Sequence, residues 1–247
     1  MKRTATLLVL LLLPWAYASD TWDRSERQEA KEFTFARLIY SGGGWRRGAS
    51  WSVDFPKADR QFLYVLHKLH DFTFINPRER AIRATDKELL RYPFLYAVEV
   101  GHMELSLEEA AALREYLLRG GFLVVDDFHG PWEWRNFYRQ MKKVFPEYEP
   151  RTLTVDHPIF HCYYSIDRLI QVPGLQYLYS GSLSEKGGVE PHYMGIEDDS
   201  GRLMVMINHN VDLGDAWEWA EVDEYPRPFA EMAIKLGTNY IIYAMTH

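Results

Sequence analysis

Cysteine is scarce in this sequence: Cys162 is the only one among 247 residues. No internal disulfide can form, so packing of the core must hold the fold together. A thiolate nucleophile would need a base and a positive environment around it. His161 adjoins Cys162, but neighbours on a strand point to opposite faces of a sheet. A buried, inert thiol is therefore the favoured interpretation.

Long runs of basic residues are also absent. The chain has 28 Lys and Arg against 35 Asp and Glu, a formal net charge of -7. No positive stripe is long enough to follow a phosphate backbone, so we expect no nucleic acid as a partner. The P-loop pattern, the GxGxxG fingerprint and the Gly-x-Ser-x-Gly elbow are missing too. The sequence thus lacks the motifs of a nucleotide site or a serine nucleophile.

Apolar runs long enough to cross a membrane are missing beyond the N-terminus. There, Lys2 and Arg3 precede the short apolar run Leu7–Leu13, and Ala16-Tyr17-Ala18 follows the small-x-small pattern of a cleavage site. We expect residues 1–18 to be a cleaved signal peptide, with an uncleaved anchor as the alternative. The protein is then exported, periplasmic or extracellular, and has no transmembrane segment after signal removal.

The composition is that of a globular protein, with 47% hydrophobic and 26% charged residues. Its length suits one large α/β domain or two small ones. Residues 19–32 are polar and charged, which predicts a flexible lead-in. We expect residues 33–247 to form a single α/β domain.

Strand and helix patterns alternate along this domain, which predicts a mostly parallel sheet flanked by helices. The first half contains the expected strands Phe33–Tyr40, Phe72–Ile75, Ala81–Ala84, Phe94–Val100 and Phe122–Val125. The expected helices there are Lys57–Leu69, Ser106–Leu118 and Trp132–Val144. The second half contains the expected strands Thr152–Val155, Gln176–Ser180, Tyr193–Glu197 and Leu203–Ile207, then the expected helix Pro228–Met245.

The end of one predicted strand carries the strongest candidate site. Phe122–Val125 is apolar throughout, as expected of a strand buried on both faces. Ligands of open α/β sheets bind outside the carboxyl ends of the strands. Asp126, Asp127 and His129 follow this strand and are therefore our candidate catalytic residues.

Two further groups of residues lie at other predicted strand ends and could reach the same cleft. One follows the first strand and includes part of a glycine-rich loop, which could present N–H groups to an anion or move over the cleft. For each residue alone, a helix cap or a hydrogen-bonded turn is the alternative role. The expected ligand-binding residues are Tyr40, Gly42, Gly43, Trp51, Asp54, His157, His209, Asn210 and Asp212.

Some of these side chains have donor atoms that suit zinc or manganese. No spacing motif identifies a metal ion, and Pro158 makes a continuous helix across His157 and His161 improbable. We therefore expect no cofactor, although the donor set could accommodate a divalent metal. The residues concerned are Asp126, Asp127, His129, His157 and His209.

Five segments together resemble the bacterial family called domain of unknown function 4159. They are Phe35–Tyr40, Trp51–Asp59, Tyr92–Tyr96, Leu113–Asp127 and Asp156–Phe160. The resemblance extends over roughly residues 33–246. It implies a class I glutamine amidotransferase-like fold, which is flavodoxin-like, here with extra β-hairpin strands in the C-terminal half.

Amidotransferase activity does not follow from this resemblance. Those enzymes have a cysteine nucleophile in a tight turn after a buried strand, whereas the comparable turn here holds Asp126, Asp127 and Phe128. We therefore expect an exported binding or assembly module that lacks the nucleophile. Its partner would be an unknown small ligand or a cell-envelope protein. The alternative is a periplasmic hydrolase that uses Asp and His residues at the strand ends, with or without a metal ion.

Overall fold

The computed structural model describes residues 33–247 except 43–49, 71 and 73. The predicted signal peptide, the predicted lead-in and Gly43 lie outside the described residues. Strands and helices alternate along the described part, as the sequence predicts.

A seven-stranded sheet forms the centre, in the order β2-β1-β3-β4-β7-β6-β5. The neighbours from β2 to β7 are parallel, and β6 and β5 continue the sheet antiparallel. The parallel part follows the flavodoxin-like order, so the predicted fold class and the added C-terminal hairpin strands are confirmed. The strands are β1 (Ala36–Ile39), β2 (Arg80–Arg83), β3 (Phe94–Val98), β4 (Phe122–Phe128), β5 (Arg151–Thr152), β6 (His192–Glu197) and β7 (Leu203–His209).

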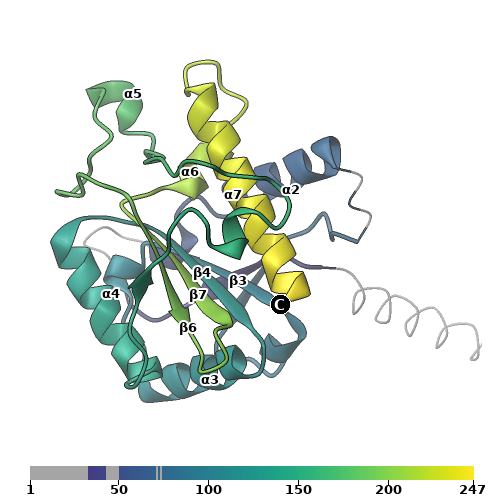
Figure 1. Ribbon diagram of the computed structural model, residues 1–247, viewed down its shortest axis with the longest axis vertical. Coiled ribbons are helices and arrows are strands. Elements are labelled where there is room, and N and C mark those ends of the chain that lie inside the picture. The colour runs from purple at the N-terminus through teal and green to yellow at the C-terminus, as the bar shows by residue number, and fades with distance from the viewer. Residues whose placement is uncertain (1–32, 43–49, 71, 73) are drawn as a thin grey trace, which may run out of the picture. The chain divides into compact units, whose positions relative to one another are not determined.

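Helices cover both faces of the sheet (Figure 1). On one face lie α2 (Lys57–Leu69), α6 (Leu213–Glu218) and α7 (Arg227–Thr246), and on the other lie α3 (Leu107–Leu118) and α4 (Gly130–Val144). The short elements are η1 (Ser50–Ser52), η2 (Leu89–Arg91), η3 (Val100–His102), η4 (Pro158–Phe160) and α5 (Tyr177–Ser180). Among the described residues, no helix has both the length and the apolar character that crossing a bilayer requires.

Alternation along the buried strands divides the core in two. In β3, Phe94, Tyr96 and Val98 pack under α2, α6 and α7, whereas Leu95 and Ala97 pack under α3 and α4. Successive strand residues point to opposite faces, so a strand that is apolar throughout serves both cores. The prediction of strands buried on both faces is therefore confirmed.

Local sequence also fixes how α3 begins and how its chain turns into β4. The Ser106 side chain accepts a hydrogen bond from the N–H of Glu109 at 3.1 Å, and the Glu109 side chain accepts one from the N–H of Ser106 at 2.8 Å. This reciprocal pair is a capping box, which the sequence indicates by a Glu three residues after a Ser at the start of the helix. Gly120 follows the helix with φ of +104°, a conformation that glycine adopts without a steric penalty.

Three strand predictions need correction. The segment Gln176–Ser180 is not a strand, because Tyr177–Ser180 forms the helical turn α5, which ends at Gly181 with φ of +67°. Among the described residues of the predicted strand Phe72–Ile75, only Ile75 forms a bridge, to Phe33. The predicted strand Thr152–Val155 shifts to Arg151–Thr152. In each segment residues with high strand propensity lack a full neighbouring strand, and propensity alone does not form a sheet.

Candidate functional site

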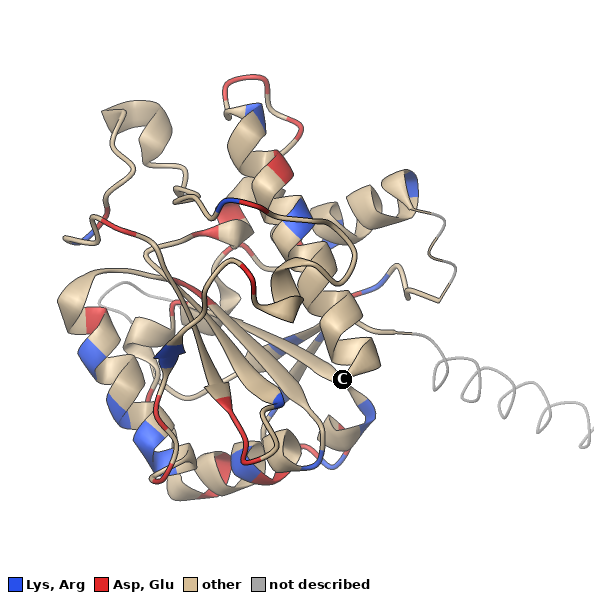
Figure 2. Ribbon diagram, in the orientation of Figure 1, with Lys and Arg blue, Asp and Glu red and all other residues tan. Residues whose placement is uncertain are grey.

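The candidate site lies at the carboxyl edge of the parallel strands. β1 is flanked by β2 on one side and by β3 on the other, so the direction of the chain's crossovers reverses between β1 and β3. In flavodoxin-like sheets the ligand crevice lies outside this point. Figure 2 shows acidic segments on and around α6, near this edge.

Three aspartates meet there, and we call Asp54, Asp127 and Asp212 the aspartate cluster. Each offers a carboxylate oxygen, and the three oxygens lie within 4.8 Å of one another. Asp54 precedes α2, Asp127 lies near the end of β4, and Asp212 is the N-cap of α6. No Lys or Arg of the described residues forms an ion pair with any of the three. Three predicted residues that are far apart in the sequence therefore come together.

A bulge in β4 directs Asp127 to this edge. The register of β4 against β7 shifts between Val125 and Phe128, and both of these residues pack in the core under α3 and α4. Residues three apart on a regular strand would face opposite sides of the sheet. The bulge places one extra residue in β4, which brings Val125 and Phe128 to the same face. Asp127 leaves the strand's regular conformation with φ of +50°.

Left-handed backbone at non-glycine residues concentrates around the site. Such conformations are costly and are typical of functional sites, where the surrounding structure imposes them. The described non-glycine residues with positive φ are Asp54 (60°), Glu99 (51°), Asp127 (50°), Lys186 (49°) and Asn210 (62°).

Burial makes ionisation of the aspartate cluster unfavourable. Asp127 and Asp212 are only 6% and 3% exposed. Desolvation raises the pKa of both carboxyls well above the ordinary value, and the neighbouring carboxylates add to the effect. Desolvation, then Asp215 and Glu218, raise the pKa of Asp54 to about 8, although Arg37 acts against them. The Oδ2 atom of Asp54 is buried without a hydrogen-bond partner. The cluster thus lacks a compensating positive charge.

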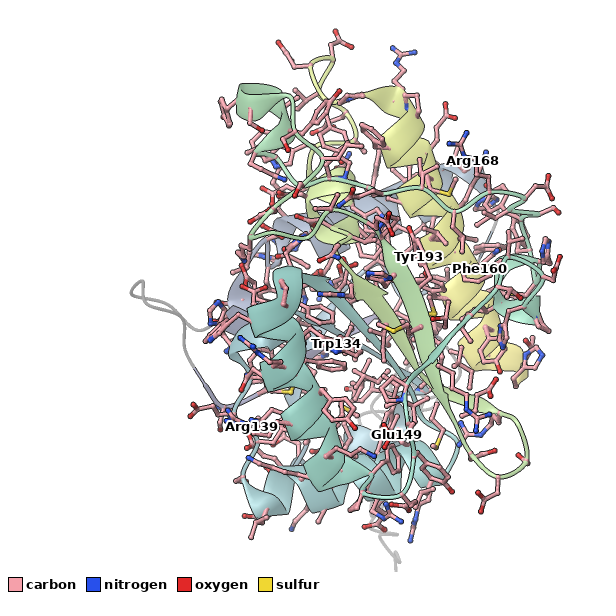
Figure 3. All side chains as sticks on the ribbon, turned by 60° about the vertical axis from the view of Figure 1, so that its left-hand side comes forward. Trp134, Arg139, Glu149, Phe160, Arg168 and Tyr193 are labelled. Atoms are coloured by element: carbon pink, nitrogen blue, oxygen red, sulfur yellow. The ribbon has the colours of Figure 1, made fainter. Side chains whose placement is uncertain are left out.

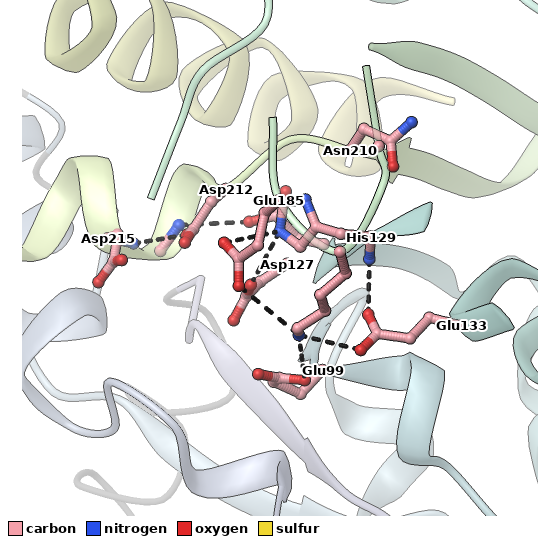
Figure 4. A network of polar contacts seen from close by, with 12 residues as sticks. Glu99, Asp127, His129, Glu133, Glu185, Asn210, Asp212 and Asp215 are labelled. Atoms are coloured by element: carbon pink, nitrogen blue, oxygen red, sulfur yellow. Dashed lines mark hydrogen bonds and ion pairs between the residues drawn. The ribbon is translucent and has the colours of Figure 1, made fainter. Parts of the chain in front are cut away.

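Lys186 neutralises a second acidic group beside the aspartate cluster (Figure 4). Its Nζ lies 2.9 Å from Oε1 of Glu133, 3.5 Å from Oε2 of Glu99 and 3.8 Å from Oε1 of Glu185. The imidazole of His102 lies 3.5 Å from Glu133 and 3.6 Å from Glu99. Glu99, His102 and Glu133 could also hold a metal ion by spacing, but Lys186 already compensates their charge.

His129 connects the two groups. It is the N-cap residue of α4, its N–H donates to Glu133 at 2.6 Å, and its Nε2 lies 3.3 Å from Oδ1 of Asp127. Burial, Lys186 and His209 lower its pKa to about 3, so the ring is neutral at physiological pH. The ring is 1% exposed and its Nδ1 has no partner. His129 can therefore orient Asp127 through one nitrogen.

The side chain of Asp126, by contrast, hydrogen-bonds within the fold. Its Oδ2 accepts hydrogen bonds from the Tyr96 hydroxyl at 2.6 Å and from the N–H groups of Leu213 at 2.8 Å and Gly214 at 3.2 Å. The residue is fully buried. Its carboxylate holds the first turn of α6, which carries Asp212, so its position favours a positioning role over direct contact with a ligand.

Three other predicted residues, Tyr40, Trp51 and Gly42, contact segments that carry or adjoin residues of the site. The Tyr40 hydroxyl lies 2.8 Å from the carbonyl of Val98 and 3.0 Å from that of Glu99, next to the crevice. Trp51 packs on Phe55 with ring centroids 5.6 Å apart, in the segment that leads to α2. Gly42 has φ of +118°, and a Cβ there would collide with the backbone of the segment after η3.

His209 is the last residue of β7, and Asn210 follows it. The Asn210 side chain accepts from the N–H of Gly130 at 2.8 Å and donates to the carbonyl of Glu190 at 2.6 Å. Nε2 of His209 lies 3.1 Å from the carbonyl oxygen of Gly130. Both residues therefore fix the start of α4.

His157 does not join this group, so the prediction that it converges with the other strand ends is wrong. Its Nε2 lies 3.6 Å from Oε1 of Glu197, which pairs with Leu203 at the beginning of β7. Asp127 lies at the other end of the sheet. The physical reason is that β5 ends after two residues and the chain then returns to the amino end of β7, where the rings of His157 and Tyr243 have centroids 6.5 Å apart.

Sequence reasoning missed the charged residues that lie around the aspartate cluster. Arg37 and Asp59 are both fully buried and form a bidentate ion pair between β1 and α2. Nη1 of Arg37 also donates to the carbonyl of Val53 at 3.3 Å, next to Asp54. The available signal was an arginine at a core-facing position of a strand otherwise rich in apolar residues. Lys186 and Glu133 left no comparable signal.

The raised pKa of Asp54 predicts a pH-dependent stability of the metal-free protein. The folded value is about 8 and the ordinary value is 3.8, so between them the native state binds more protons than the unfolded state. Stability should therefore rise as pH falls from about 8 to about 6.5. Below that, the lowered pKa values of His129, about 3, and His209, about 4, oppose the trend, because the unfolded state then binds more protons at these histidines.

Thermal unfolding between pH 5 and pH 9 would measure this profile. The rise between about pH 8 and 6.5 should shrink in Asp54→Asn, which has no titrating carboxyl at that position. An unchanged profile in the variant would show that Asp54 is not responsible.

One protein-family model matches this chain. It is described as domain of unknown function (DUF4159) and aligns with residues 34–245, a range that contains the whole aspartate cluster. The family resemblance predicted from sequence is confirmed, while the amidotransferase-like part of it stays a prediction. A search of curated proteins finds no match.

Proposed function

This chain belongs to the family of the domain of unknown function (DUF4159), and we propose that it is an exported binding module that holds a divalent cation in the aspartate cluster. The N-terminal residues, with Lys2 and Arg3 before a short apolar run, support export. The fold would be amidotransferase-like without the cysteine nucleophile.

The cation proposal depends on one observation. Three carboxylate oxygens of Asp54, Asp127 and Asp212 lie within 4.8 Å of one another, with no Lys or Arg of the described residues paired to them. Buried charges are usually paired or coordinate metals. Hard cations such as Mg²⁺, Ca²⁺ and Mn²⁺ take carboxylate oxygens as ligands. A bound divalent ion would therefore offset the repulsion within the cluster.

The surroundings of Cys162 support binding without thiol chemistry. Its Sγ lies 3.1 Å from the carbonyl oxygen of Asn239, in α7, and 3.4 Å from that of Ile159. Burial raises the pKa of the thiol, which lowers its thiolate fraction. No histidine hydrogen-bonds to it among the described residues. A module that binds a ligand or assembles with a cell-envelope protein fits these features better than a thiol enzyme.

Calorimetric titration of the metal-free protein with Mg²⁺, Ca²⁺ and Mn²⁺ tests the proposal. We expect one ion to bind, and Asp54→Asn to weaken its binding by at least about tenfold, since even indirect changes at metal sites cost that much. Asp223→Asn is the matched control, because the Asp223 side chain is 96% exposed. Absence of binding for all three ions would refute the cation site.

A metal-assisted hydrolase is the second candidate, favoured by the neutral His129 ring 3.3 Å from Asp127. A carboxylate and an imidazole beside a metal ion could activate a bound water. The test compares wild type and Asp127→Ala on ester, amide and glycoside substrates in the presence of the bound ion. Equal rates for the two proteins would exclude this candidate.

A further inference from the structure

A cavity of about 400 Å³ lies beside the aspartate cluster, and none of the three aspartates lines it. We call it the Trp134 pocket. Its volume falls in the range of small-molecule sites. Figure 3 shows Trp134 on the side of α4 that faces the sheet. The other lining residues come from the start of α4, the end of β7, the segment before β6 and the first residue of β6: Gly130, Pro131, Gly187, Val189, Glu190, His192, His209 and Asn210.

Aromatic rings form one wall of this pocket. The rings of Trp134 and His209 have centroids 5.2 Å apart, and those of His192 and His209 are nearly parallel at 5.6 Å. Behind them, Phe128 and Phe137 pack against Trp134. The wall is therefore held by the core. Aromatic faces carry partial negative charge.

One polar group in the lining of the pocket, the carboxylate of Glu190, is available to a ligand. The Asn210 side chain is occupied by its bonds to Gly130 and Glu190. His209 is a neutral ring at physiological pH, since burial lowers its pKa to about 4. No Lys or Arg lines the pocket. The exposed carboxylate of Glu190 forms no ion pair or hydrogen bond among the described residues.

We propose that the Trp134 pocket binds an organic ammonium group carried on an apolar stem. The indole and imidazole faces would attract the cation, the Glu190 carboxylate would balance its charge, and Pro131 and Val189 would contact the stem. An anionic ligand would meet the Glu190 carboxylate without a lysine or arginine in the lining, and an uncharged ligand would gain no ion pairing from Glu190. The source is either a free small molecule or a lysine side chain of a partner.

Titrations followed by NMR, at the indole N–H resonance of Trp134 and with a chelator present, test this site independently of any divalent ion. The probes are choline, its uncharged dimethylbutanol isostere and N-acetyl-lysine methylamide. We expect saturable binding of at least one ammonium probe, and roughly tenfold weaker binding of the isostere. The tighter ammonium probe identifies the source. Equal binding of choline and the isostere, or no binding of either ammonium probe, would overturn the proposal.

Substitutions at exposed residues keep the test independent of folding. Glu190→Gln changes an exposed residue and should weaken ammonium binding about two- to fivefold. Glu221→Gln, at an exposed site outside the lining, should leave it unchanged. Trp134→Leu identifies the resonance, because this variant lacks the indole N–H. If Glu190→Gln and Glu221→Gln bind alike, Glu190 does not recognise the charge and the assignment of this site fails.

Discussion

Replacing Asp127 with Asn is expected to make the metal-free protein more stable and to abolish its stabilisation by divalent cations. The unfolding temperature should rise by about 2 to 4 °C, the shift that about 1 kcal/mol produces in a chain of this size. Stabilising changes at strained functional sites are commonly of this magnitude. Wild type, in contrast, should gain stability when the cation is added.

Three properties of Asp127 lead to this expectation. Its carboxylate is buried near those of Asp54 and Asp212, so removing its charge relieves repulsion. Asn can still accept the hydrogen bond from His129 through its side-chain oxygen. Asn also adopts the left-handed conformation, here with φ of +50°, more readily than most residues. A change that benefits the fold and removes ligand binding would identify the carboxylate as functional.

Differential scanning calorimetry with and without the ion that binds best would measure both effects. Asp223→Asn, an exposed acidic site, should alter neither the metal-free unfolding temperature nor the response to the ion. A fall of several degrees in metal-free Asp127→Asn would instead assign the carboxylate to structure and count against the cation site.

Breaking the buried ion pair between Arg37 and Asp59 should have the largest effect on stability. Arg37→Met leaves the Asp59 carboxylate buried without its partner, which should cost about 3 to 5 kcal/mol. The double variant Arg37→Met, Asp59→Leu removes both charges and should recover most of that loss. Arg37 also holds the carbonyl of Val53, so the segment carrying Asp54 should loosen in the double variant.

Urea unfolding would measure these free energies. A matched control is Arg60→Met, since Arg60 lies 2.8 Å from Glu79 but its side chain is 64% exposed. This exposed pair should contribute less than about 1 kcal/mol. If Arg37→Met costs no more than Arg60→Met, then Asp59 does not remain as an uncompensated buried charge.

Sequence reasoning predicted the elements better than it predicted the site. The helix Lys57–Leu69 agrees with α2 in its bounds, because its apolar side recurs with helical period. The strand predicted as Phe122–Val125 continues to Phe128, and the bulge that turns Asp127 outward was not visible in the sequence. A bulge arises from pairing with β7, which lies far along the chain.

The candidate site residues also include both correct and incorrect predictions of which side chains become neighbours. Asp54, Asp127 and Asp212 were all predicted and meet within 4.8 Å. His157 was predicted to join them but lies at the opposite end of the sheet, beside Glu197. Residue type indicates which chemistry a side chain can perform, whereas topology decides which side chains become neighbours.

The sequence by itself determined the alternation of strands and helices, the capping box at Ser106 and the absence of a cysteine at Asp126, Asp127 and Phe128. These features depend on near neighbours, on periodicity and on residue identity. The tertiary structure alone decided that Arg37 pairs with Asp59, that Lys186 lies among glutamates, and that Asp127 and Asp212 are buried. The reason is that burial and charge pairing arise only when the fold brings segments distant in the sequence together at one edge of the sheet. Burial and charge pairing then determine the raised pKa values of the aspartate cluster.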